Sequence, residues 1–230
     1  MQKLKISLEG NLSANVLYLP ALRDSDQVLL LLSEIWGINQ HILEIAEQYV
    51  NLGFHVLIPN VFFRQKETVC LDYDEQDTQT AYHLYQQLDL VQAATDLDQI
   101  MDQSLKMIGK TQIHILGFCM GGTLCYLLKN AQIKTRIAYY GSKIGQYLEQ
   151  IQSIQQPTII HLALNDHLIG LEEIDHLKKA VQGSKNIQTF CYDKVGHGFN
   201  CPYRANYNKV ASELAYQTNL SFLKNFLGER

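Results

Sequence analysis

Residues 28–32 read Val-Leu-Leu-Leu-Leu, an uninterrupted apolar run with the length of one β-strand. A strand that is apolar on both sides is buried on both faces, which is typical of a parallel sheet covered by helices. The run is followed by a helical period, which Asn39 can cap and Gly53 can end. Further strand-length runs alternate with helical periods, so we expect an α/β protein. Its sheet should be mostly parallel and doubly wound, with helices on both faces and a site at the carboxyl ends of the strands.

The remaining elements follow from the same patterns. The first two expected strands, 3–9 and 14–19, alternate apolar and polar residues and should form an antiparallel pair. Residues 60–78 have no clear period and are expected to form a long surface connection. The other expected strands are 28–32, 54–59, 112–116, 136–140, 157–163 and 187–192. Besides the helix between Asn39 and Gly53, the expected helices are 79–108 with a break near Asp89, 119–130, 171–182 and 205–227.

Composition narrows the class of protein. The chain has 230 residues, 47% of them hydrophobic, which suits one α/β domain spanning 1–230. A net charge of −4 argues against binding to nucleic acid. The five cysteines are an odd number without a C-x-x-C pair, so neither disulfides nor a metal site are expected. With no signal peptide or membrane-spanning stretch visible, we expect a soluble, cytoplasmic monomer without a cofactor that acts on a small molecule.

Residues 117–122, Gly-Phe-Cys-Met-Gly-Gly, join an expected strand to an expected helix. This is the frame of a nucleophile elbow, whose small residues permit a sharp turn, but Cys119 stands where a serine is usual. The amino end of a helix favours negative charge, so Cys119 is placed to be a thiolate. The alternative is an inert thiol in a glycine-rich turn.

A thiol nucleophile needs a base and a group that orients the base, and in this fold the acid precedes the histidine along the chain. Asp166 follows the expected strand 157–163, and His197 follows strand 187–192 with a glycine on each side. The alternatives are His167 as the base and Asp175 or Asp193 as the acid.

These motifs together resemble the dienelactone hydrolase family of α/β-hydrolases, in which the nucleophile is a cysteine. The segment Ser-Glu-Ile-Trp-Gly at 33–37 is similar to a family segment after the third strand, and 53–59 and 81–85 are similar to two further family motifs. The resemblance covers nearly the whole chain. It implies a single α/β-hydrolase domain that hydrolyses carboxylic esters or lactones, of the carboxymethylenebutenolidase type.

The resemblance also implies roles for residues outside the three already discussed. A glutamate at the position of Glu34 contacts the nucleophile in the resting enzyme, and substrate binding moves it so that it takes the thiol proton. The thiolate is then paired with the histidine. An oxyanion hole would be formed by the backbone amides of Ile35 and Met120.

Two family arginines that hold a substrate carboxylate are missing, since Thr78 and Cys201 occupy their positions. Arg64 and Arg204 are candidates to replace them, the alternative for each being a solvated surface charge. The other expected substrate contacts are Trp36, Tyr82 and Phe199.

The resulting hypothesis is a Cys119–His197–Asp166 triad that forms an acyl-enzyme with an ester or lactone. Activated esters and enol-lactones should be preferred over amides, since a thiolate is itself a good leaving group. One rival is a non-hydrolytic, ligand-binding or thiol-redox member of the same fold. The other is a metal-dependent hydrolase that uses His161, His167 and Asp166.

Overall fold

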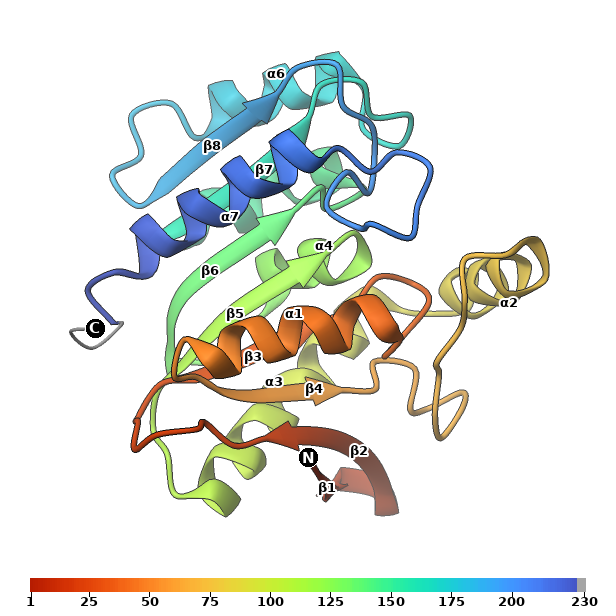
Figure 1. Ribbon diagram of the computed structural model, residues 1–230, viewed down its shortest axis with the longest axis vertical. Helices are drawn as coiled ribbons and strands as arrows, with labels where there is room; N and C mark the ends of the chain where they lie inside the picture. The colour runs from red at the N-terminus through yellow and green to blue at the C-terminus, as the bar shows by residue number, and fades with distance from the viewer. Residues whose placement is uncertain (227–230) are drawn as a thin grey trace.

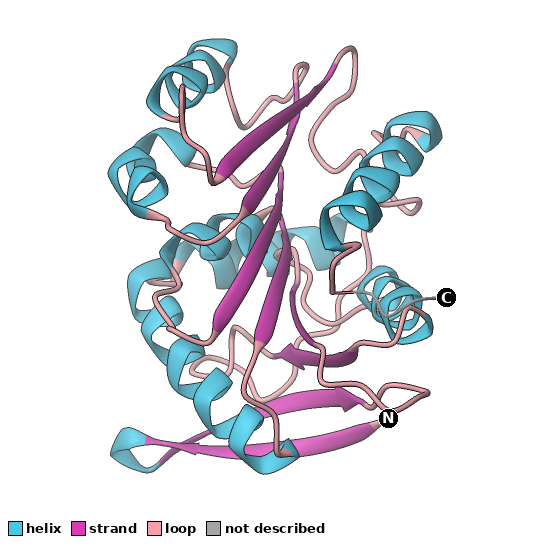
Figure 2. Ribbon diagram, turned by 90° about the vertical axis from the view of Figure 1, so that its left-hand side faces the viewer, coloured by secondary structure: helices cyan, strands magenta, loops and turns pink. Residues whose placement is uncertain are grey.

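The computed structural model describes residues 1–226 and places an eight-stranded sheet between two layers of helices (Figure 1 and Figure 2). The strand order is β1-β2-β4-β3-β5-β6-β7-β8. Pairs β1–β2 and β2–β4 are antiparallel, and all the others are parallel, so the prediction of a mostly parallel α/β sheet is confirmed. The strands are β1 Gln2–Leu8, β2 Leu12–Leu19, β3 Val28–Leu32, β4 His55–Pro59, β5 Ile113–Phe118, β6 Ile133–Tyr139, β7 Thr158–Ala163 and β8 Ile187–Tyr192.

Helices α1 and α7 cover one face of the sheet, and α3, α4, α5 and α6 cover the other, while α2 lies at the side near the carboxyl ends of the strands (Figure 1). None of the helices in residues 1–226 is both long and apolar enough to cross a bilayer. The helices are α1 Gln40–Asn51, α2 Glu75–Gln86, α3 Leu90–Ile108, α4 Met120–Leu127, α5 Leu148–Ser153, α6 Leu171–Ala180 and α7 Lys209–Leu223, with 3₁₀ turns at Glu9–Asn11 and Ile144–Tyr147.

The centre of the sheet explains where the site forms. Every residue of β3, β5 and β7 is buried, as expected for strands covered by helices on both faces. The chain leaves β3 for α1 and then β4 on one side, whereas β5 lies on the other side of β3. The loops at the carboxyl ends of β3 and β5 therefore run in opposite directions. Open α/β sheets bind ligands at such a point, where the strand order reverses.

Several helix ends follow from side-chain caps. The expected break near Asp89 is confirmed, because Asp89 accepts hydrogen bonds from the amides of Val91 and Gln92 and starts α3. Helix α2 starts at Glu75, four residues before the expected 79, since the Asp74 carboxylate caps it. The long connection is correspondingly shorter than expected.

The carboxyl-terminal helix also starts at a cap. The expected start at 205 is wrong, because Asn208 accepts a hydrogen bond from the amide of Ala211 and α7 begins at Lys209. The expected end at 227 lies outside the described residues. Strand β6 begins at Ile133, three residues before the expected 136, and the short helix α5 was not expected.

Candidate active site

Cys119 lies between the last residue of β5 and the first residue of α4. Its backbone has φ 52° and ψ −114°, a conformation that side-chain-bearing residues rarely adopt and that indicates local strain. A Cβ at Gly117 would stand 2.1 Å from the carbonyl oxygen of Gly121, and a Cβ at Gly121 would stand 2.4 Å from that of Leu32. The glycines thus allow strand and helix to meet closely, and the strand–turn–helix expected of an elbow is present.

Replacing Gly121 by alanine is expected to destabilise the fold by about 1–3 kcal/mol, because the new methyl group meets backbone that cannot move aside. Urea unfolding would measure the loss. Gly170→Ala is the matched control, since no atom lies within 4 Å of a Cβ at that position and its φ is −65°. Equal stability of the two variants would show that close packing at Gly121 does not limit the fold.

His197 and Asp166 lie at the ends of neighbouring strands. Asp166 follows β7, His197 follows β8, and the Nδ1 of His197 lies 2.8 Å from the Oδ2 of Asp166 with both side chains buried. The other carboxylate oxygen of Asp166 accepts a hydrogen bond from the amide of Leu168 at 2.8 Å. Asp166 is therefore held in place on both sides, and it fixes the orientation of the imidazole.

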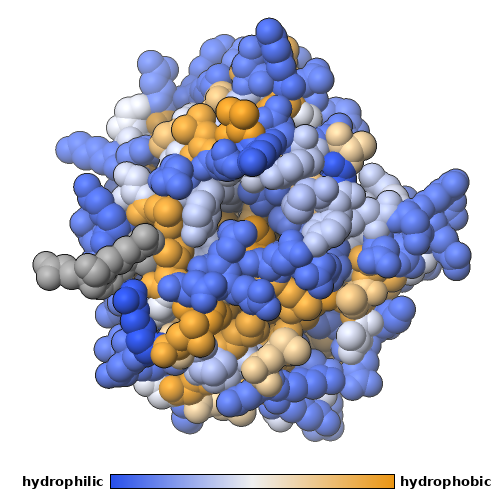
Figure 3. Space-filling model, in the orientation of Figure 1, coloured by the Kyte–Doolittle hydropathy of each residue, from blue (hydrophilic) through white to orange (hydrophobic). Residues whose placement is uncertain are grey.

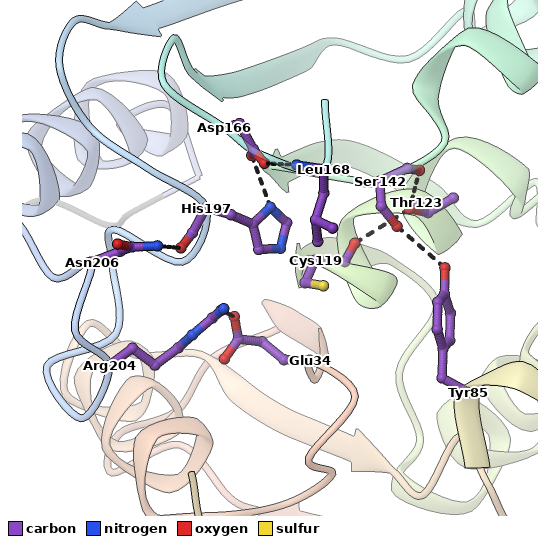
Figure 4. A network of polar contacts seen from close by, with 10 residues as sticks. All are labelled: Glu34, Tyr85, Cys119, Thr123, Ser142, Asp166, Leu168, His197, Arg204 and Asn206. Atoms are coloured by element: carbon purple, nitrogen blue, oxygen red, sulfur yellow. Dashed lines mark hydrogen bonds and ion pairs between the residues drawn. The ribbon is translucent and has the colours of Figure 1, made fainter. Parts of the chain in front are cut away.

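The second nitrogen of His197 is left free. Its Nε2 is buried, has no hydrogen-bond partner among residues 1–226, and points toward the Sγ of Cys119 (Figure 4). The His167 ring lies 5.9 Å from the His197 ring, but it is exposed and makes no hydrogen bond to Cys119 or Asp166 among residues 1–226. Asp175 and Asp193 are exposed as well. The structure thus brings together Cys119, His197 and Asp166, and not the alternatives.

The charge state of His197 follows from its neighbours. Burial acts to lower the pKa, but the attraction of Cys119 and the hydrogen bond to Asp166 outweigh it and raise the pKa of His197 from 6.5 to about 10. The raised pKa therefore favours a protonated imidazole at neutral pH.

This shift predicts a pH dependence of stability. A pKa that is higher in the folded protein means that the folded protein holds the proton more tightly, so folding gains stability from it. The gain is fully present below pH 6.5 and is lost as the pH rises to about 10. The difference in unfolding free energy between wild type and His197→Gln should therefore shrink across this window. The exposed His176, replaced in the same way, is the control, and a difference that does not change with pH would contradict the charge state assigned to His197.

Glu34 is the second residue after β3 and forms a buried ion pair. Its Oε1 lies 2.7 Å from the Nη1 of Arg204, and the Tyr73 hydroxyl donates to its Oε2 at 3.1 Å. The guanidinium of Arg204 also lies over the Trp36 ring, 4.8 Å from its centroid. Within residues 1–226 no hydrogen bond joins Glu34 to Cys119, and in Figure 4 the Glu34 carboxylate faces Arg204. In this state of the site, Arg204 and Tyr73 hold the carboxylate that the resemblance places on the nucleophile.

A cavity of about 330 Å³ opens over Cys119. The backbone amide of Met120, which follows the nucleophile, stands at the first position of α4, where a helix has no acceptor for it. Ile35, the other expected amide donor, lines the cavity. Three expected substrate contacts line it too: Trp36, Tyr82 and Arg204. The site therefore combines a thiol, an imidazole and backbone amides with a cavity large enough for a small molecule.

Comparison with known proteins agrees with this geometry. The family model for the dienelactone hydrolase family matches residues 14–227. The chain belongs to the dienelactone hydrolase family. It is 24% identical over 199 residues to a carboxymethylenebutenolidase of Pseudomonas putida, covering 85% of this chain and 84% of that protein. It is 27% identical over 218 residues to a putative carboxymethylenebutenolidase of Escherichia coli, covering 88% and 78%.

Solved structures show the same fold. A putative dienelactone hydrolase from Klebsiella pneumoniae superimposes with a TM-score of 0.82 at 19% identity, covering 98% of this chain and 99% of that one. The expected resemblance and the expected α/β-hydrolase fold are therefore confirmed.

Two of the substrate contacts expected for this dienelactone hydrolase family member lie elsewhere. Arg64 is not in the lining of the cavity, because the buried carboxylate of Asp96 binds it, with an Nη2–Oδ1 distance of 2.8 Å. Phe199 is fully buried, and its ring packs 4.9 Å from that of Tyr192 and 5.4 Å from that of Tyr140. Its apolar ring belongs to the core and does not reach the cavity.

The cavity also has polar lining residues that the sequence did not single out, among them Tyr85 and Ser142. The Tyr85 hydroxyl lies 3.2 Å from the Ser142 hydroxyl. The backbone carbonyl of Ser142 accepts a hydrogen bond from the Thr123 hydroxyl (Figure 4). Ser142 follows β6, so the rule that ligand-binding residues follow parallel strands could have found it.

The structure does not bring His161, His167 and Asp166 together as a metal site. Both nitrogens of His161 are occupied in the core, by the Tyr192 hydroxyl at 2.7 Å and by the Asn219 amide oxygen at 2.9 Å. Among the described residues, no three His, Cys, Asp or Glu side chains are grouped so that they could hold a metal ion.

Proposed function

We propose that this chain hydrolyses carboxylic esters or lactones through a Cys119–His197–Asp166 triad and an acyl-enzyme intermediate. Membership of the dienelactone hydrolase family supports the class of reaction, ester or lactone hydrolysis. The observation that carries the triad is the imidazole of His197, bonded through Nδ1 to Asp166 and free at the Nε2 that faces Cys119.

The first half-reaction forms a thioester. The thiolate of Cys119 attacks the carbonyl carbon, and the amides of Ile35 and Met120 stabilise the negative charge that develops on the oxygen. The tetrahedral adduct then expels the alkoxide or enolate, which takes a proton from the Nε2 of His197. The neutral His197 next accepts a proton from water, and the hydroxide formed attacks the thioester. Collapse of this second adduct releases the acid and restores the thiolate with protonated His197.

The thiolate limits the range of substrates. In the tetrahedral adduct it competes as a leaving group with the departing oxygen or nitrogen. An enolate or a phenolate competes well, whereas the amine of an amide does not. The preferred substrates are therefore enol-lactones and activated esters.

Arg204 supplies the substrate-binding cation that the family pattern lacks at Thr78 and Cys201. It lines the cavity, and its charge is held there by Glu34. A substrate carboxylate that binds Arg204 competes with Glu34 for the guanidinium. Glu34 is thereby released from the guanidinium and can take the proton of the resting Cys119 thiol, which leaves the thiolate that attacks. When the product leaves, the Glu34 carboxyl returns this proton to Cys119 and pairs with Arg204 again. This couples activation of the thiol to the presence of a carboxylate-bearing substrate.

A substrate panel tests this assignment. Lactones that bear a free carboxylate are paired with neutral esters of the same size, and kcat/KM is measured for each. Loss of a charge-assisted hydrogen bond of about 1.5–3 kcal/mol means that Arg204→Gln should lower the carboxylate-to-neutral ratio about 10- to 100-fold. Arg64→Gln is the control, because Arg64 lies outside the cavity lining. An unchanged ratio in Arg204→Gln would remove Arg204 from substrate binding, and failure of every ester to turn over would favour a non-hydrolytic member of the fold.

A further inference from the structure

A second cavity, of about 260 Å³, lies between α1 and α7 on the opposite face of the sheet from α4. Figure 3 shows this face of the molecule, hollowed between the two helices and bordered by hydrophilic side chains. Helix α1, helix α7, strand β5 and the loop before α7 all contribute to its walls. None of its lining residues lines the cavity over Cys119, so the two are separate sites.

Two buried polar atoms in this lining have no hydrogen-bond partner among residues 1–226. They are the Nε2 of His41, a residue 1% exposed, and the Oδ1 of Asn200, a residue 7% exposed. Asn200 donates through Nδ2 to the Ser212 hydroxyl at 3.0 Å, which leaves its oxygen as a free acceptor. A buried polar atom without a partner destabilises the fold, so both atoms favour a ligand that bonds to them.

Both atoms can accept a proton-bearing group. Burial lowers the pKa of His41, outweighing the Glu34 and Glu44 carboxylates that act to raise it, so its ring is neutral. A neutral imidazole protonated at Nδ1 is an acceptor at Nε2. With His41 in that tautomer, both buried atoms in the lining are acceptors, and they suit a ligand with several N–H or O–H donors.

Charge in the lining selects between such ligands. Glu44 of α1 and Glu213 of α7 line the cavity, and no Lys or Arg is found in its described lining. Lys209 binds Glu213 at 3.7 Å, but on an exposed surface where the pair contributes little. The lining also includes the rings of Tyr49, Phe118 and Tyr139, which offer apolar surface to an alkyl chain. Carboxylates, neutral acceptors and aromatic rings together select a small organic cation.

We propose that this cavity binds a small primary alkylammonium compound. Its three N–H groups reach the Oδ1 of Asn200 and the Nε2 of His41, its charge is balanced by Glu44 and Glu213, and its alkyl chain packs on the aromatic rings. This second site is independent of the reaction at Cys119.

The test uses the full chain and three probes of equal length: butylammonium chloride, butan-1-ol and sodium butyrate, at constant ionic strength. Binding is followed by the ring proton resonances of His41 and by isothermal titration. Butylammonium should bind and shift the His41 resonances, while butanol binds more weakly and butyrate does not bind. Binding of the three probes with equal affinity, or no binding of butylammonium at millimolar concentration, would overturn the proposal.

Variants place the binding in this cavity. Removal of one partly screened carboxylate is worth up to about 1 kcal/mol, so Glu213→Gln should weaken butylammonium binding about two- to fivefold. Glu213 is exposed, so this variant should fold normally. Glu149→Gln, an exposed carboxylate on α5, is the control and should leave the affinity unchanged. Equal affinity in Glu213→Gln and wild type, or a ligand shift confined to His197, would also contradict the assignment, whether or not the chain hydrolyses esters.

Discussion

Replacement of Cys119 by alanine is expected to lower kcat/KM for an activated ester by about 10⁴-fold or more, because no other group can form the acyl-enzyme. Cys119 is the residue that the elbow places at the start of α4, 5% exposed and facing the free nitrogen of His197. Hydrolysis of p-nitrophenyl acetate under steady-state conditions measures the loss. The variant should fold, since a methyl group is smaller than the thiol it replaces.

Cys119→Ser is the matched control, because it keeps a nucleophilic atom in a side chain of similar size. A hydroxyl ionises far less readily than a thiol, so the serine variant should fall between wild type and Cys119→Ala. Activity of Cys119→Ala close to that of wild type would show that the thiol is an inert group in a glycine-rich turn.

Asp166→Asn is expected to lower kcat/KM on the order of 10³-fold. Asparagine is nearly the same size, but it removes both the charge and the hydrogen bond that act to raise the pKa of His197. Its amide can also present a donor to Nδ1, which would select the tautomer with its proton on the wrong nitrogen. The proton should therefore be held less well between Cys119 and His197, and the pH profile of kcat/KM should shift.

Asp175→Asn is the control for this second variant, since Asp175 is an exposed carboxylate on α6. Thermal unfolding of both variants separates a loss of activity from a loss of fold. If Asp166→Asn kept the wild-type pH profile and rate, another group would have to orient His197.

The fold was accessible from the sequence because its main signals are local. The five consecutive apolar residues of β3 point to both faces of the sheet, so both faces must be buried. This implies a parallel sheet with helices on each side. In such a sheet the carboxyl ends of the strands meet at one edge. Asp166 after β7 and His197 after β8 were therefore expected to approach Cys119 after β5, and the structure places them together.

The substrate residues were less accessible because they depend on contacts between distant loops. Glu34 and Arg204 are 170 residues apart, and they pair only because the loop before α7 folds back over the end of β3. By sequence, Arg64 was an equally good candidate for the substrate-binding cation. In the structure its guanidinium is paired with Asp96, which lies 32 residues further along the chain on α3. No local pattern distinguishes these two arginines.

The most direct test of the triad is to map the acyl group. The protein is mixed with p-nitrophenyl acetate, quenched in acid within the first turnovers, digested, and searched for acetylated peptides by mass spectrometry. We predict an acetyl group on Cys119 in the wild type and none in Cys119→Ala. In His197→Gln the ratio of acetylated Cys119 to released product should be higher than in the wild type, because deacylation needs the imidazole. Rapid hydrolysis by wild type with no acetyl at Cys119, or with acetyl at another side chain that turns over at the same rate, would contradict the account.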